Sequence, residues 1–79
     1  MSERRKSNRR RVLKAAKVAF EGSAVDCVVR DISPTGAGIQ IEAPTGVPHE
    51  FHLLIASDHS NRACHVIWRK QKRMGIAFY

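Results

Sequence analysis

The sequence lacks any long apolar run, and this absence excludes several classes of protein. No stretch approaches the roughly 20 apolar residues that a membrane-spanning helix needs. The 79 residues are enough for one domain but not for two. The pair Arg4-Arg5 is not followed by the apolar segment of an export signal, because Lys14 and Lys17 interrupt residues 12–20. We therefore expect a cytoplasmic chain with no membrane contact.

Cysteines and catalytic motifs are scarce as well. Cys27 and Cys64 lie in apolar stretches, so we interpret both as reduced thiols of the core. The sequence has no Gly-x-Ser-x-Gly elbow and no glycine-rich phosphate loop, which argues against an enzyme. The four histidines are His49, His52, His59 and His65. Because neighbours in a strand point to opposite faces, they do not form the close pairs of a zinc site. We expect no catalytic residue, no metal and no cofactor.

Acidic residues are few near the N-terminus, and the net charge of +7 is confined there. Residues 1–17 carry eight Lys or Arg and one acidic residue, whereas residues 18–79 carry six of each sign. Within residues 1–11, arginine outnumbers lysine five to one. Arginine binds phosphate bidentately, reads the Hoogsteen edge of guanine and stacks on bases. The sequence predicts a flexible basic arm over residues 1–11 that binds an anion, although a solvated charged tail has the same composition.

Apolar alternation with a period of two dominates the rest of the chain. The alternating residues are often β-branched, which favours strands over helices. We expect six strands at residues 15–20, 24–32, 38–42, 50–57, 62–69 and 74–79. Such a pattern predicts an all-β barrel or sandwich. Because closure removes exposed strand edges, we favour a six-stranded antiparallel β-barrel over residues 12–79.

Two details of this pattern need the structure to decide them. Four apolar residues of the segment 9–20 also share one helical face, so a helix is the alternative to a strand there. These are Val12, Ala15, Ala16 and Ala19. Most aromatic side chains fall in the apolar alternation and are expected in the core, whereas Tyr79 ends the chain. The expected core aromatics are Phe20, Phe51, Trp68 and Phe78.

Two short polar motifs stand out. Arg5 and Arg9 form an Arg-x-x-x-Arg pair, and an Asp-x-Ser-x-x-Gly motif follows at Asp31, Ser33 and Gly36. The carboxylate of Asp31 can accept the N–H groups of a guanine, and the hydroxyl of Ser33 can donate to a phosphate. Glycine at position 36 lets the backbone pass close to a ligand. The same residue types are also typical of a plain turn.

The order and spacing of these motifs, with the β pattern around them, resemble the PilZ domain family over nearly the whole chain. The resemblance implies a β-barrel that binds the bacterial second messenger cyclic di-GMP. Carried over, Arg5 and Arg9 would contact phosphates and the Hoogsteen edges of guanine. Asp31 and Ser33 would contact guanine and the sugar-phosphate ring, and Gly36 would shape the turn.

The same resemblance extends to Arg4 and Arg10 as further ligand contacts, because intercalated ligand dimers in this family recruit neighbouring arginines. We expect the arm to become ordered on binding, with phosphate contacts offsetting the entropy cost. The docked arm would then signal to a downstream protein partner. Ligand stoichiometry and homodimer formation stay open.

Two other functions compete with this interpretation. A basic arm on a small β-barrel is also typical of nucleic-acid-binding modules. Such barrels usually display stacking aromatics on the sheet, and here we expect the aromatics in the core, which argues against nucleic acid. The third candidate is a family member that has lost its ligand and acts as a protein adaptor.

Overall fold

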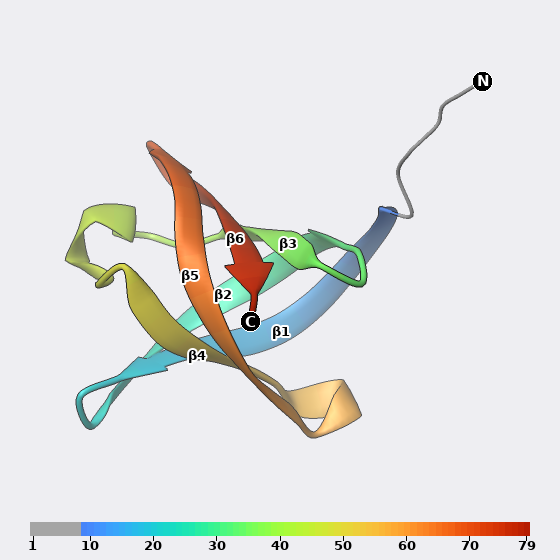
Figure 1. Cartoon of the computed structure of the whole chain (residues 1–79), viewed down its shortest axis with the longest axis horizontal. Coiled ribbons are helices and arrows are strands. Elements are labelled where there is room, and N and C mark those ends of the chain that lie inside the picture. The colour runs from blue at the N-terminus through green and yellow to red at the C-terminus, as the bar shows by residue number, and fades with distance from the viewer. Residues whose placement is uncertain (1–8) are drawn as a thin grey trace.

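The computed structural model describes residues 9–79, and six strands form a closed antiparallel barrel within them (Figure 1). The strands are β1 (Arg10–Phe20), β2 (Ser23–Ile32), β3 (Gly36–Gln40), β4 (Glu50–Ile55), β5 (Ser60–Lys70) and β6 (Arg73–Phe78). Their order around the barrel is β1-β2-β3-β6-β5-β4. The predicted six-stranded antiparallel barrel is confirmed.

The helical segments of the described chain are two 3-10 turns, η1 (Pro44–Gly46) and η2 (Ala56–Asp58). No helix within residues 9–79 is long and apolar enough to cross a membrane. The turn η2 ends β4 at Ile55, two residues before the end of the predicted strand 50–57.

The first strand settles the alternative between strand and helix. β1 pairs with β2 on one side and with β4 on the other, so the helical interpretation of residues 9–20 is wrong. Ala16 and Val18 are buried, and Lys17 between them is exposed. The pairing on both sides and the burial of alternate residues outweigh the helical propensity of the alanines. The hairpin to β2 closes through Glu21 and Gly22, which both have positive φ (48° and 78°), as a tight two-residue turn requires.

The core is made of the inward-facing apolar residues of all six strands. The largest fully buried side chains are Val18, Val29, Ile39, Leu53, Ile55, Cys64 and Met74. Cys27 and Cys64 are both buried free thiols, which confirms their predicted place in the core. Burial raises the pKa of each thiol to about 11.

Three irregularities interrupt the alternation of the barrel wall. The strand register shifts between Arg11 and Lys14 in β1, between Val29 and Asp31 in β2, and between Val66 and Trp68 in β5. A β-bulge adds one residue to one strand of a pair and so reverses which residues face inward beyond it. The bulge in β2 leaves Arg30 exposed and Asp31 half-buried, although strict alternation would place Asp31 on the inner side with Val29.

The bulge in β5 also corrects one core prediction. Trp68 is 44% exposed, so its expected place in the core is wrong. The extra residue in β5 breaks the alternation after Val66, and the indole lies on the outer face. The other aromatic predictions hold, because Phe51 is buried while Phe20 and Phe78 are partly buried and pack against the core.

Candidate functional site

Four residues form one transverse row on the outer face of β2, β3, β6 and β5. Asp31 pairs with Gly38, Gly38 with Gly75, and Gly75 with Trp68. A Cβ on Gly38 would lie 2.7 Å from an Asp31 carboxylate oxygen, and a Cβ on Gly75 would overlap the Trp68 indole. Gly38 therefore leaves room for the side chain of Asp31, and Gly75 leaves room for that of Trp68. Because neighbouring strands lie about 4.8 Å apart, the Cα atoms of the row span about 14 Å. The Asp31 carboxylate lies over Gly38 and the Trp68 indole over Gly75, so these two groups are closer together than the ends of the row.

The carboxylate of Asp31 joins the two sequence motifs. It accepts the backbone N–H of Gly38 at 3.0 Å and also pairs with the guanidinium of Arg9. The Asp31 side chain is 22% exposed and the Arg9 side chain 51% exposed. The second arginine of the Arg-x-x-x-Arg motif and the aspartate of the other motif are thus in contact.

The start of β1 brings further arginines close to Asp31. Figure 1 shows the beginning of β1 close to the β2–β3 turn. Arg11 is in register with Asp31, whereas Arg10 is in register with Ile32. Because successive strand residues point to opposite faces, Arg11 rather than Arg10 shares the outer face with Asp31. Arg4 and Arg5 lie outside the described residues.

The remaining motif residues, Ser33 and Gly36, build the turn between β2 and β3. The Ser33 N–H donates to the carbonyl of Gly36 at 2.8 Å, and the Ser33 hydroxyl accepts the N–H groups of Thr35 and Gly36 at 3.3 and 3.2 Å. Gly36 does not need positive φ. A side chain there would collide with the backbone carbonyl of Ile76 on β6, so glycine is required by the close approach of two strands.

A basic pocket of about 420 Å³ adjoins this row. Its lining residues are Arg11, Val12, Leu13, Arg30, Asp31 and Arg73. The guanidinium of Arg30 donates to the side-chain oxygen of Gln40 at 2.8 Å. The hairpin strands β1 and β2 and the distant strand β6 thus supply three arginines to one concave surface, and such a cluster of positive charge attracts anions.

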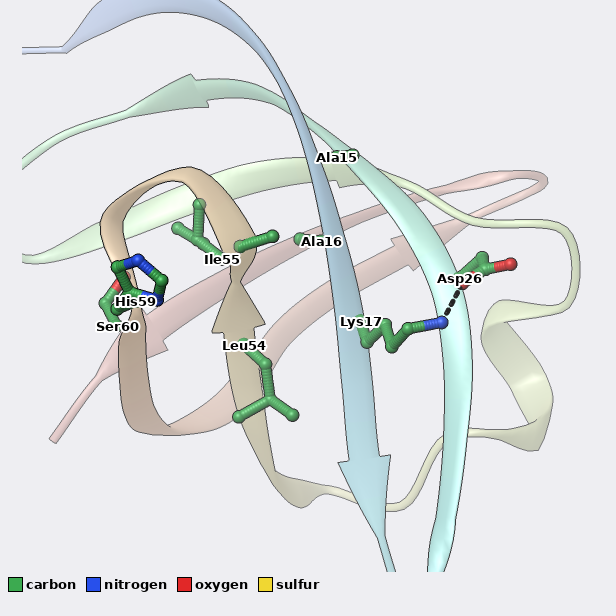
Figure 2. Close-up of a pocket in the computed structure, with 9 residues that line it drawn as sticks. Ala15, Ala16, Lys17, Asp26, Leu54, Ile55, His59 and Ser60 are labelled. Atoms are coloured by element: carbon green, nitrogen blue, oxygen red, sulfur yellow. Dashed lines mark hydrogen bonds and ion pairs between the residues drawn. The ribbon is translucent and has the colours of Figure 1, made fainter.

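A second pocket of about 400 Å³ lies on a different face, between β1, β4 and η2 (Figure 2). Apolar residues form most of its wall: Ala15, Ala16, Leu54, Ile55 and Ala56. The ion pair between Lys17 and Asp26, with 2.5 Å between Nζ and Oδ1, stands at one side, and His59 and Ser60 stand at the other. The cation here is already neutralised, so this surface suits an apolar group better than a phosphate.

His49, His52 and His65 line neither of these two pockets, whereas His59 lines the second one. The rings of His49 and His65 have centroids 5.7 Å apart, and Tyr79 packs against His65 at 4.7 Å. The Tyr79 hydroxyl donates to Glu50 at 2.5 Å. Among the described residues, no group of three or more His, Cys, Asp or Glu is arranged to hold a metal.

Sequence reasoning missed most of the wall of the candidate site. Arg30, Arg73 and Trp68 were not singled out as binding residues, because a bulge decides which way Trp68 points and another brings Asp31 into the same pocket as Arg30 and Arg73. Gly38 and Gly75 carried a usable signal. An isolated glycine inside a strand often marks a bulge or a close approach, and both glycines have that role here.

Comparison with known proteins adds one positive match. The model of the PilZ domain matches residues 3–79, essentially the whole chain. No curated protein matches the chain.

Proposed function

Because the chain belongs to the PilZ domain family, which comprises cyclic di-GMP-binding domains rather than enzymes, we propose that it binds this ligand on the outer face of β2, β3, β6 and β5. The contact between Arg9 and Asp31 carries the proposal, since it brings residues of both family motifs to one place on that face. The N-terminal end of β1 supplies arginine, and the end of β2 supplies the carboxylate.

The chemistry of the row suits the ligand. Cyclic di-GMP has two phosphate charges and two guanines. Asp31 can accept the N1–H and N2–H₂ groups of one guanine. At the opposite end of the row, the exposed face of the Trp68 indole offers a stacking surface for a base. Gly38 and Gly75 have no side chains of their own, and this leaves room for the carboxylate of Asp31 and the indole of Trp68 to lie over them.

Ligand binding rearranges the arm in this proposal. Asp31 holds Arg9 in the ligand-free chain, so a guanine that binds the carboxylate competes with that guanidinium. Arg9 is then available for a phosphate or a Hoogsteen edge, together with Arg4 and Arg5, and Arg11 rather than Arg10 is the neighbouring arginine on that face. Since phosphate contacts order such segments, the arm folds over the ligand and presents a new surface to a partner protein or a second copy of the chain.

Isothermal titration with cyclic di-GMP tests the proposal. We expect saturable binding, and Arg5→Ala, Arg9→Ala and Asp31→Ala should each weaken it by about 1–3 kcal/mol, the value of a bidentate base contact. Asp26→Ala is the matched control, because Asp26 is an exposed carboxylate of β2 that pairs with Lys17 away from the row. A folded chain that gives no heat at micromolar concentration contradicts the proposal. A folded chain that ignores nucleotide would instead fit a protein adaptor.

A nucleic-acid-binding function is the second candidate, and the exposure of Trp68 favours it. The expectation that all large aromatics except Tyr79 are in the core was the main argument against nucleic acid, and Trp68 breaks that expectation. The family match still favours the cyclic dinucleotide. Competition separates the two: a single-stranded oligonucleotide that displaces cyclic di-GMP at equal phosphate concentration, with steep salt dependence, would support nucleic acid.

A further inference from the structure

We propose that Arg30 and Arg73 form a phosphate-binding clamp on the barrel wall, separate from the arginines of the arm. This inference rests on the proposed function, because the phosphate is assigned to the same ligand. It concerns the pocket lined by Arg11, Arg30 and Arg73, and it assigns to the barrel itself a part of the phosphate binding that the sequence attributed to residues 1–11.

The first argument is the way the strands present these two side chains. The register shift before Asp31 leaves Arg30 as an extra residue of β2 relative to β3, exposed beside Asp31. Gln40 of β3 pairs with Arg73 of β6, and its side-chain oxygen accepts a hydrogen bond from Arg30 at 2.8 Å. This bond holds one guanidinium on the outer face before any ligand arrives. Pre-organisation of this kind lowers the entropy cost of binding.

The second argument is the distribution of ion pairs. The carboxylates that form ion pairs within residues 9–79 do so with Arg9, Lys14, Lys17 and Lys72. None of these ion pairs involves Arg11, Arg30 or Arg73. The pocket therefore carries three uncompensated guanidinium charges beside a carboxylate that Arg9 already neutralises. A ligand with two phosphate charges complements that excess.

The third argument is the position of the clamp relative to the row. Gln40 lies two residues beyond Gly38 on the same strand, which is about 7 Å along the outer face. A guanine bound at the Asp31 carboxylate thus has its phosphate within reach of the long side chains of Arg30 and Arg73, which line the same pocket as Asp31. The planar guanidinium suits a phosphate better than an ammonium does, because it can donate two parallel hydrogen bonds.

Titration of the full chain with cyclic di-GMP tests the clamp. Arg30→Gln and Arg73→Gln should each weaken binding about tenfold or more, and the double variant more than either single one. Lys17→Gln is the control, since it removes one exposed positive charge from β1 on the face of the apolar pocket, and it should leave the affinity unchanged. Arg30→Lys should recover part of the loss, because it restores the charge but not the planar fork.

The outcomes distinguish failure of the clamp from failure of the proposed function. If the wild-type chain binds cyclic di-GMP and both glutamine variants bind equally well, the clamp is overturned while the function stands. If the wild-type chain does not bind, the proposed function fails, and inorganic pyrophosphate becomes the probe. Changes in the NMR amide signals of residues 30, 40 and 73 on addition of pyrophosphate would then support an anion site at Arg30 and Arg73. Unchanged spectra would overturn the clamp.

Discussion

Asp31 and Gly38 occupy the same step of the β2–β3 ladder, and the N–H of Gly38 donates to the Asp31 carboxylate at 3.0 Å. The bond lies beside the bulge, where the side chain of Asp31 provides an acceptor for a backbone N–H. The direction of the carboxylate that we assign to guanine binding is therefore fixed by a residue on the neighbouring strand.

Replacing Gly38 by alanine should damage binding more than folding. The new Cβ would lie 2.7 Å from an Asp31 carboxylate oxygen, so the carboxylate must turn away. The displaced group is the end of a flexible side chain, and we expect the urea midpoint to change little. Affinity for cyclic di-GMP should fall about tenfold, or about 1.4 kcal/mol.

Gly46→Ala is the matched control for Gly38→Ala. A Cβ at position 46 meets nothing within 4 Å, and no positive φ is needed there. We expect unchanged affinity and unchanged stability for this variant. Equal affinity of Gly38→Ala and the wild-type chain, measured side by side by calorimetry, would show that the orientation of Asp31 does not matter for binding.

Gly36→Ala should destabilise the fold rather than act on the ligand directly, although Gly36 belongs to the family motif. A Cβ at position 36 would collide with the backbone carbonyl of Ile76, which cannot swing aside as a side chain can. We expect a loss of about 1–3 kcal/mol in the free energy of unfolding, typical of overpacking. Urea denaturation followed by circular dichroism measures it. A normal midpoint combined with lost ligand binding would assign Gly36 to the ligand instead.

Gly75→Ala should change the fluorescence emission of Trp68. Trp68 is the single tryptophan of the chain, and its indole occupies the place where a Cβ on Gly75 would lie. Since Trp68 already borders solvent, we expect the ring to move outward and its emission maximum to shift to longer wavelength. Emission identical to that of the wild-type chain in the folded variant would mean that the indole does not rest on Gly75.

The sequence was sufficient for the architecture but not for the make-up of the face to which we assign ligand binding. Alternation predicted the strands and the all-β barrel, because inward and outward residues alternate along most of each strand. The bulges at Arg30 and before Trp68 are single-residue departures from that period, set by how neighbouring strands pair. They turned Trp68 from an expected core residue into an exposed one, and they brought Asp31 into the same pocket as Arg30.

Net charge predicts a basic arm, but it does not show how charge is distributed over the barrel. Residues 18–79 carry equal numbers of each sign, which suggested a wall without an electrostatic role. The structure separates those charges in space. Lys14 and Lys17 of β1 pair with Asp58 and Asp26, while Arg30 and Arg73 on the outer face have no carboxylate partner within residues 9–79. The net charge adds up all charges of the chain, whereas a ligand interacts mainly with the charges on the face where it binds.

The buried thiols make the stability of the barrel depend on alkaline pH. Burial raises the pKa of Cys27 and Cys64 from 9.0 to about 11, because the thiolate loses its hydration in the core. The folded chain holds these protons more tightly than the unfolded chain. The resulting stabilisation is therefore complete below pH 9 and is lost as the pH rises from 9 to about 11. Urea midpoints measured across that range should fall.

The same pKa shift predicts slow thiol chemistry, and the two measurements check each other. With a pKa of about 11, roughly 0.1% of each thiol is ionised at pH 8 in the folded chain. Labelling with iodoacetamide at pH 8 should therefore be slow in buffer and fast in urea, because the thiolate is the reacting form. A Cys27→Ala/Cys64→Ala double variant removes the thiol contribution and leaves other alkaline groups, including Tyr79, in place. If that variant loses stability between pH 9 and 11 as steeply as the wild-type chain, the thiols are not the cause of the decline.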